Sequence, residues 1–179
     1  PRFLADVFDP GSTMKAISVA GAMDFEPNLS LGTRFYCEKG LWHYGGFPLR
    51  DAGHNYKNLS IKDIIKKSSN IGTAKIILYS SRTRRSLYSV LKGFGFGSKT
   101  DINLGPESAG ILRKEKNWSR VSYTRLPIGQ GISVTPLQMI QAYCTLANYG
   151  RMMKLQIVDK ITDAKTGRVI KEFEPEVKN

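Results

Sequence analysis

Cysteine and acidic residues are scarce in this chain of 179 residues, and long hydrophobic runs are absent. The two cysteines, Cys37 and Cys144, are too few for a disulfide scaffold or a zinc cluster, although one bridge between them stays possible. No stretch reaches the roughly 18–20 consecutive apolar residues that a membrane span needs, and residues 1–7 do not read as a signal peptide. Hydrophobic residues still make up 41%, which suits one globular domain with a core.

The shortage of acidic residues leaves a net charge of +12, from 27 Lys+Arg against 15 Asp+Glu. Such a charge suits a nucleic-acid binder, a protein that works beside anionic lipid or an acidic polymer, or simply a solvated surface. The basic residues are spread along the chain, with small clusters at Lys66–Lys67 and Arg82–Arg85. No zinc-finger spacing, aromatic RNA-binding strand or basic heptad region accompanies them, so we expect no nucleic-acid partner.

The first half of the chain has helical patterns at three places and an irregular stretch. Pro10-Gly11 is a turn signal, and a helix is expected over residues 12–24. Residues 31–57 show no sustained period and are expected to form a long surface excursion. The region 60–80 is expected to hold two helical runs separated at Ser68-Ser-Asn70, followed by a third helix at 84–92. Ser60 and Asp63 resemble a capping box at the start of this region.

The second half has one strong helix signal and one hairpin signal. Thr135-Pro-Leu-Gln138 combines an N-cap threonine, a proline at the first helical position and a glutamine that completes a capping box. We expect a helix over 135–149, with Gly150 after its end. Alternating segments within 156–173 predict a hairpin that turns at Asp163–Gly167. The buried stripe of the helix is expected to consist of Leu137, Ile140, Tyr143, Cys144 and Ala147.

Ser12 and Lys15 form the best candidate for chemistry. A serine hydroxyl is a weak nucleophile that needs a base nearby, and residues three apart share one face of a helix. The lysine amine is a base only when neutral, and burial and the positive end of a helix both lower its pKa. Backbone N–H groups at the same helix start can hold a developing oxyanion. This spacing therefore indicates acyl transfer through a serine ester, although Ser-x-x-Lys also arises by chance.

Two further segments contain serines that could take part in similar chemistry. Ser89-Val-Leu-Lys92 repeats the Ser-x-x-Lys spacing inside a helical pattern, without a Pro-Gly lead-in, and is interpreted as structural. Ser68-Ser-Asn70 interrupts two apolar helical runs and offers a second hydroxyl for proton relay and an amide for binding a peptide carbonyl. Serine and asparagine also cap or break helices for purely local reasons, so Ser68 and Asn70 alone prove nothing.

The two segments together, in this order, resemble the first two motifs of penicillin-binding transpeptidases: Asp9-Pro-Gly-Ser-Thr-Met-Lys15 and Ser68-Ser-Asn-Ile-Gly72. The likeness covers nearly the whole chain and is strongest to monofunctional (class B) penicillin-binding proteins, with the Ser-Ser-Asn form leaning towards the division-type branch. It continues through Gly93–Gly97, Leu104–Gly110, Ile128–Gly131, Val134–Gln138 and Thr145–Gly150. The resemblance implies an α/β (α+β) penicillin-binding or serine β-lactamase-like fold. Within residues 1–179 we expect a partial transpeptidase domain that is mostly helical, with a C-terminal β-hairpin.

The resemblance also implies roles and partners. Ser12 would be acylated by the D-alanyl-D-alanine end of a peptidoglycan stem peptide or by a β-lactam antibiotic, and Lys15 would take its proton. Ser68 would pass a proton to the leaving amine, while Asn70 would position Lys15 and the substrate amide. The family needs no cofactor and no metal. The parent protein would act in septal cell-wall synthesis, cell division or cell shape, with its catalytic domain outside the cytoplasmic (inner) membrane, an anchor outside this sequence and partners among membrane proteins of cell-wall synthesis.

One departure from the family pattern concerns its third motif, Lys-Thr/Ser-Gly. Lys165-Thr-Gly167 has the right letters but is preceded by Asp163 and followed by Arg168 between alternating segments, so we interpret it as a hairpin turn. The sequence would then lack the third motif, and the isolated chain would acylate poorly or not at all. Alternatives are a serine β-lactamase or β-lactam sensor, for which no convincing glutamate is found, and a non-catalytic scaffold with the same fold.

Overall fold

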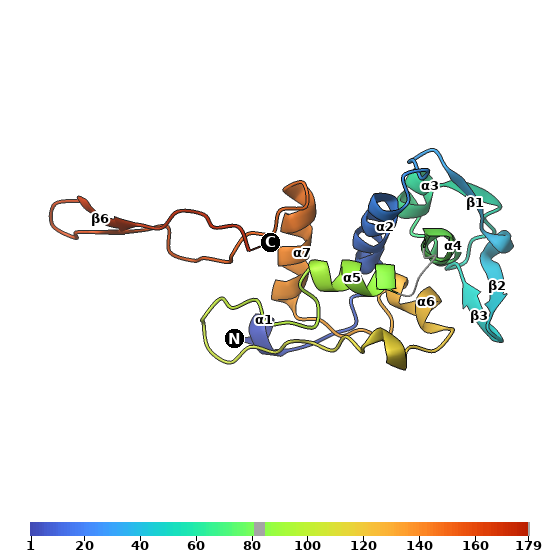
Figure 1. Ribbon diagram of the computed structural model, residues 1–179, viewed down its shortest axis with the longest axis horizontal. Helices are drawn as coiled ribbons and strands as arrows, with labels where there is room; N and C mark the ends of the chain where they lie inside the picture. The colour runs from blue at the N-terminus through green and yellow to red at the C-terminus, as the bar shows by residue number, and fades with distance from the viewer. Residues whose placement is uncertain (81–84, 179) are drawn as a thin grey trace.

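A computed structural model describes residues 1–80 and 85–178 of the chain (Figure 1). Helices and strands come in groups along it: strands β1–β4 follow α2, helices α3–α7 come next, and β5 and β6 come last, with short 3-10 turns, labelled η, between several of them. In chain order the elements are α1 (Arg2–Ala5), η1 (Gly11–Thr13), α2 (Met14–Phe25), β1 (Arg34–Tyr36), η2 (Glu38–Gly40), β2 (Leu41–Tyr44), β3 (Phe47–Arg50), β4 (Asn58–Ser60), α3 (Ile61–Lys66), α4 (Asn70–Ser80), α5 (Arg85–Gly93), η3 (Glu115–Asn117), α6 (Ser122–Arg125), η4 (Leu126–Ile128), α7 (Pro136–Ala147), β5 (Lys160–Thr162) and β6 (Val169–Glu172).

Helix α2 lies at the centre of the helical body and packs against α4, α5, α7 and η4. It buries residues on most of its circumference, among them Met14 and Ile17, which are fully buried. Gly21 brings α2 close to α5, since a Cβ at this position would come within 2.4 Å of Val90 Cγ1. The helix expected from residue 12 begins as the 3-10 turn η1 and becomes α-helical at Met14. The nucleophile candidate Ser12 thus lies in the 3-10 turn that leads directly into a well-packed helix.

The stretch 31–57, which the sequence analysis described as irregular, contains strands, so that expectation was wrong. β2 and β3 form an antiparallel hairpin in which Tyr44 pairs with Phe47 across Gly45-Gly46. Both glycines have positive φ (60° and 85°), as a tight two-residue hairpin turn requires. β1 pairs with β4, more than 20 residues further along the chain. Such pairings are set by tertiary contacts, and strands this short show little alternation in a sequence.

Helix α7 begins with the expected capping box: the Thr135 hydroxyl accepts from the Gln138 N–H at 3.2 Å, and the Gln138 side chain accepts from the Thr135 N–H at 2.9 Å. The expected buried stripe was wrong, except at Leu137. Ile140 is 56% exposed and Tyr143 is 40% exposed. The buried face of α7 carries three polar side chains, whose hydrogen bonds to backbone groups compensate their burial. The prediction took the apolar residues of the helix as its buried face, and this was wrong for four of them. The exposed residues are Ile140, Tyr143, Cys144 and Ala147.

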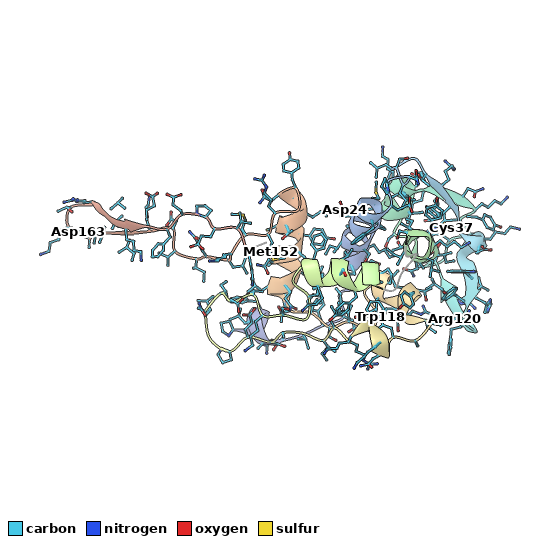
Figure 2. The ribbon with its side chains drawn as sticks, in the orientation of Figure 1. Asp24, Cys37, Trp118, Arg120, Met152 and Asp163 are labelled. Carbon is cyan, nitrogen blue, oxygen red and sulfur yellow. The ribbon has the colours of Figure 1, made fainter. Side chains whose placement is uncertain are left out.

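The hairpin of β5 and β6 extends away from the helical body (Figure 1). Every residue of both strands is exposed. Asp163 marks its tip in Figure 2, far from α2 and the short sheets. The Lys165–Gly167 segment lies in this turn, as the sequence predicted, with the Gly167 N–H donating to the Asp163 carbonyl at 2.9 Å.

The structure also describes the two cysteines, the third expected helix and the lengths of the helices. Cys37 and Cys144 are both free thiols, the first buried and the second exposed. Helix α5 spans Arg85–Gly93, whereas the expected start at Arg84 and most of the basic cluster at 82–85 lie outside the described residues. In the part of the chain that the structure describes, no helix combines the length and apolar composition that crossing a bilayer requires.

Candidate active site

Ser12 lies in the 3-10 turn η1, at the entry to α2, with its side chain exposed. The turn is closed locally by the Thr13 hydroxyl, which donates to the Pro10 carbonyl at 2.6 Å. Gly11 adopts a positive φ of 55°, a conformation that glycine reaches without strain. Its N–H donates to the Gly129 carbonyl at 3.1 Å. This geometry presents the Ser12 hydroxyl to solvent from a turn that is fixed on both sides.

Gly129 is a site residue whose role the sequence analysis missed. A Cβ on it would lie 2.2 Å from the Gly11 carbonyl oxygen and 2.3 Å from the Gly11 nitrogen, and its φ is +75°. Only glycine fits where two backbones approach this closely. The motif Ile128-Gly-Gln-Gly131 had entered only as part of the family resemblance, and nothing in one sequence says which turn it contacts. In the fold it supports the nucleophile turn directly.

Lys15 follows Ser12 by one helical turn and is almost completely buried, with 3% of its surface exposed. Its Nζ donates to the carbonyl oxygen of Ser68 at 2.5 Å and to the Ser68 hydroxyl at 2.8 Å. Burial lowers the pKa of Lys15 to about 8, and the nearby carboxylate of Asp51 opposes that shift. A substantial fraction of this amine is therefore neutral near physiological pH, as a general base requires.

Ser68 owes its position to the end of α3. The Ser69 N–H donates to the Ile64 carbonyl at 3.0 Å and the Ser68 N–H to the Ile65 carbonyl at 3.1 Å. These two bonds form a Schellman motif, in which the residue at the Ser68 position is usually glycine because φ must be positive. Ser68 has φ of 55°. In this left-handed conformation both its carbonyl and its hydroxyl reach Lys15.

Asn70 is the first residue of α4, two residues beyond Ser68. Its side-chain amide donates to the Arg50 carbonyl at 2.7 Å, at the end of β3. Among the described residues it makes no hydrogen bond to Lys15, the contact that the family resemblance implied. The structure therefore brings Lys15 and Ser68 together directly and sets Asn70 on the neighbouring turn, tied to β3.

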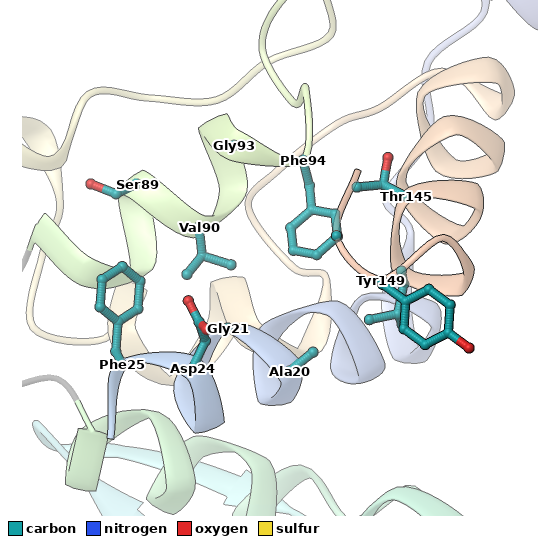
Figure 3. Close-up of a pocket in the computed structure, with 12 residues that line it drawn as sticks. Ala20, Gly21, Asp24, Phe25, Ser89, Val90, Gly93, Phe94, Thr145 and Tyr149 are labelled. Atoms are coloured by element: carbon teal, nitrogen blue, oxygen red, sulfur yellow. The ribbon is translucent and has the colours of Figure 1, made fainter. Parts of the chain in front are cut away.

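The second Ser-x-x-Lys pair has a different environment. Ser89 and Lys92 lie inside α5, as expected, and the Lys92 amine donates to Ser98 Oγ at 2.5 Å and to the Gly97 carbonyl at 3.3 Å. Ser89 is an exposed residue at the rim of a cavity of about 500 Å³ between α2, α5 and α7 (Figure 3). The cavity touches α2 at Ala20–Phe25, two or more turns from Ser12, so it is not the site of the Ser12 chemistry.

The reactive groups of the candidate site are the hydroxyls of Ser12 and Ser68 and the amine of Lys15. Within residues 1–80 and 85–178, no group of three histidine, cysteine or acidic side chains is placed to hold a metal ion. Lys165 is exposed two residues beyond Asp163, which Figure 2 shows at the hairpin tip, far from the helix that carries Lys15. A serine at a helix entry, a buried amine one turn later and a second hydroxyl bonded to that amine define a site suited to serine acyl transfer.

Comparison with known proteins agrees with this class of site. Residues 2–179 match the penicillin binding protein transpeptidase domain. Penicillin-binding protein PbpB of Mycolicibacterium smegmatis is 37% identical over 94% of this chain and 26% of that protein. Peptidoglycan D,D-transpeptidase FtsI of Escherichia coli is 31% identical over 87% of this chain and 26% of that protein. The chain thus spans about a quarter of the length of these relatives.

Solved structures show the same fold. The transpeptidase domain of Burkholderia pseudomallei penicillin-binding protein 3 superposes with a TM-score of 0.83 at 32% identity, covering 92% of this chain and 48% of that one. Penicillin-binding protein 3 of Mycobacterium tuberculosis, solved in complex with aztreonam, gives the same TM-score at 30% identity, covering 98% of this chain and 38% of that one. The chain belongs to the penicillin-binding protein transpeptidase family, in its class B branch.

Proposed function

We propose that this chain carries the nucleophile of a peptidoglycan D,D-transpeptidase, with Ser12, Lys15, Ser68 and Asn70 as its catalytic residues. The observation that supports this most is the buried Lys15 amine, which donates to the Ser68 hydroxyl at 2.8 Å while its pKa is lowered to about 8. Burial of an amine costs free energy unless it is hydrogen-bonded, and here both bonds of the amine go to Ser68, which carries the second hydroxyl of the proposed site. Family membership supplies the substrate class: D-alanyl-D-alanine stem peptides, and β-lactams as their mimics.

In the proposed acylation step, the Ser12 Oγ attacks the carbonyl carbon of the penultimate D-alanine. Neutral Lys15 takes the hydroxyl proton and passes it through the Ser68 hydroxyl to the nitrogen of the terminal D-alanine, so that the peptide C–N bond breaks and D-alanine departs with both Lys15 and Ser68 neutral again. The backbone N–H of Ser12 is suited to hold the oxyanion that develops in the transition state, whereas the Gly11 and Thr13 N–H groups already donate to the Gly129 and Pro10 carbonyls. The product is a serine ester of the stem peptide, and Asn70 positions the substrate amide.

In the second step, an amine of a neighbouring stem peptide attacks the ester and releases Ser12. A new peptide bond forms, the ester bond breaks, and Lys15 and Ser68 run the same proton transfers in reverse. A β-lactam opened by Ser12 leaves no small product and keeps the acceptor amine away, so the acyl-enzyme persists. The mechanism needs neither cofactor nor metal.

The relatives support a setting for the proposed activity. Escherichia coli FtsI is a peptidoglycan D,D-transpeptidase by name, and the similarity of this chain to it supports a role in septal cell-wall synthesis. The catalytic domain would then lie outside the cytoplasmic membrane, anchored there and recruited by membrane proteins of cell division. A net charge of +12 suits work beside an anionic cell envelope.

The direct test is labelling of the full-length coding product with fluorescent penicillin, followed by mass spectrometry of the labelled peptide. We expect the label on Ser12, and its complete loss in Ser12→Ala with a melting temperature nearly unchanged. Label on another residue, or a large loss of stability in Ser12→Ala, would contradict the proposal. Ser89→Ala is the matched control and should label like the wild type.

Deacylation kinetics separate this function from the alternatives. A transpeptidase shows one burst of β-lactam opening and then stalls, whereas a β-lactamase turns over continuously. Cross-linking of stem peptides in the presence of an acceptor amine completes the test. A full-length protein that binds division proteins but never acylates would instead be a scaffold with the same fold.

A further inference from the structure

Asp51 is a buried carboxylate that the mechanism above does not use. It follows β3 directly and is 6% exposed. Its own N–H donates to the Gly40 carbonyl at 3.1 Å, which fixes it to the end of η2. A buried carboxylate is costly unless hydrogen bonds and a nearby positive charge stabilise it, so its partners indicate why it is there.

Within residues 1–80 and 85–178, the hydrogen bonds to this carboxylate come from the segment that follows Ser68. One oxygen accepts from the Ser69 hydroxyl at 2.8 Å, and the other accepts from the N–H groups of Asn70 at 2.6 Å and Ile71 at 3.0 Å. Ser69 in turn accepts from the Gly72 N–H at 2.9 Å. Asp51 and Ser69 together satisfy the first N–H groups of α4, which no carbonyl of that helix can reach.

These bonds hold Ser68 where Lys15 needs it. Ser68 sits between the end of α3 and the start of α4, in a left-handed conformation that is unfavourable for a serine. The Schellman bonds fix its N-terminal side, and the Asp51 cap fixes its C-terminal side. Without that cap the turn could relax, and the Ser68 carbonyl and hydroxyl would move away from the Lys15 amine.

We infer that Asp51 is a positioning residue for acylation: it clamps the Ser68–Asn70 turn to β3 and so holds the Ser68 hydroxyl against the Lys15 amine. This inference rests on the proposed function. A displacement of about 1 Å in a catalytic group can cost roughly a hundredfold in rate. We therefore expect Asp51→Ala to slow acylation of Ser12 by roughly 10- to 100-fold, with little change in where the label goes.

Charge and hydrogen bonding at Asp51 are separable. Asp51→Asn keeps an oxygen that can accept from the Asn70 and Ile71 N–H groups but removes the negative charge. Among the described residues, the titratable groups that interact with this carboxylate are Lys15 on α2 and the buried Cys37 thiol, and Lys75, which is paired with Glu38, acts on Cys37. Because the Asp51 charge raises the pKa of Lys15, its removal should move the acid limb of the acylation profile to lower pH.

The experiment measures second-order acylation by fluorescent penicillin from pH 6 to 9 on the full-length coding product. It compares wild type, Asp51→Ala, Asp51→Asn and Ser69→Ala with Thr135→Ala, which removes a helix cap on α7 away from Lys15. We expect Asp51→Ala to be at least tenfold slower than Thr135→Ala at temperatures where both are folded. Asp51→Asn should stay within about threefold of wild type at its plateau, with its acid limb at lower pH.

Two results would overturn the inference: Asp51→Ala acylating as fast as Thr135→Ala, or Asp51→Asn acylating as slowly as Asp51→Ala. If Asp51→Ala does not fold, the milder variant Ser69→Ala tests the inference instead, since it removes one of the three hydrogen bonds to the Asp51 carboxylate. It should be slower than Thr135→Ala, and equality of the two would count against the clamp. Failure of the proposed function gives a different result, a wild-type protein that is never labelled at Ser12.

Discussion

The helical body and the C-terminal hairpin each contain a lysine in a three- or four-residue motif typical of serine acyltransferases. The two lysines differ in burial and in hydrogen-bond partners. Lys15 in the body is 3% exposed, and burial lowers its pKa to about 8. Lys165 in the hairpin is exposed, and the neighbouring Asp163 carboxylate accepts from backbone N–H groups of the turn at 2.7 and 3.0 Å. Whether such a motif can be reactive depends on the burial and the partners of its lysine, and the motif sequence alone specifies neither.

The difference extends to what holds each region in place. Around Lys15 the bonds connect residues more than 50 positions apart, between α2 and the turn that precedes α4. In the hairpin the turn bonds join residues within five positions of one another. Non-local bonds exist only when the whole body is folded, whereas local ones form in an isolated turn. Substitutions in the two regions should therefore differ sharply in effect.

The largest effect is expected from the Lys15 amine. Lys15→Met keeps the length of the side chain but removes the base, and loss of a general base typically lowers the rate by 10²–10⁴-fold. Lys92→Met is the matched control, because Lys92 also follows a serine by three residues and also bonds a hydroxyl. Rates of labelling by fluorescent penicillin should fall for the first and stay within twofold for the second. Equal losses would mean that burial does not distinguish the two lysines.

The next effect concerns Gly129, which supports the Ser12 turn from outside α2. Gly129→Ala places a methyl group about 2.2 Å from the Gly11 carbonyl oxygen, at a φ that alanine adopts with strain. We expect a stability loss of about 1–3 kcal/mol and a fall in acylation that exceeds it. Denaturant unfolding and acylation rates measure the two. Gly150→Ala has the same positive φ with open space around it and should cost stability without the loss of acylation.

A third test uses pH. In the proposed mechanism the free amine of Lys15 is the active form, and burial lowers its pKa to about 8. Acylation should therefore rise close to tenfold per pH unit below about pH 7.5 and level off above about pH 8.5. A profile that keeps rising to pH 10 would mean that the lysine is exposed to solvent in the working enzyme and that the contrast with Lys165 is lost.

Local signals in the sequence explain what could be predicted. The capping box of α7 and the turn at Asp163–Gly167 each depend on bonds within a few residues, whereas the break at Ser68–Asn70 is also held by Asp51. The buried face of α7 and the strands between 31 and 57 were missed for the opposite reason. Gln138 and Gln141 are buried because distant carbonyls accept from them, and β1 finds its partner far along the chain.

The residues of the candidate site also fall into two groups, those that the sequence indicates and those that only the fold reveals. Ser12, Lys15 and Ser68 are candidates from the sequence because spacing and family resemblance point to them. Their catalytic roles stay a prediction, to which the structure adds the hydrogen bond between Lys15 and Ser68. Gly129 and Asp51 could not be named, because each acts on a turn that lies far away in sequence. A glycine and an aspartate have no chemical signature by themselves, and only the folded chain shows what they touch.

The smallest effect is expected at Lys165. Lys165→Ala removes an exposed ammonium, and the Asp163 carboxylate keeps its bonds to the backbone N–H groups of Lys165 and Thr166, which alanine retains. Exposed substitutions of this kind usually change stability by less than about 0.5 kcal/mol. We expect acylation of the full-length protein to be unchanged as well, because the hairpin points away from α2. A tenfold loss of labelling in this variant would place Lys165 at the substrate carboxylate, and the hairpin would then be the third motif that its letters suggest.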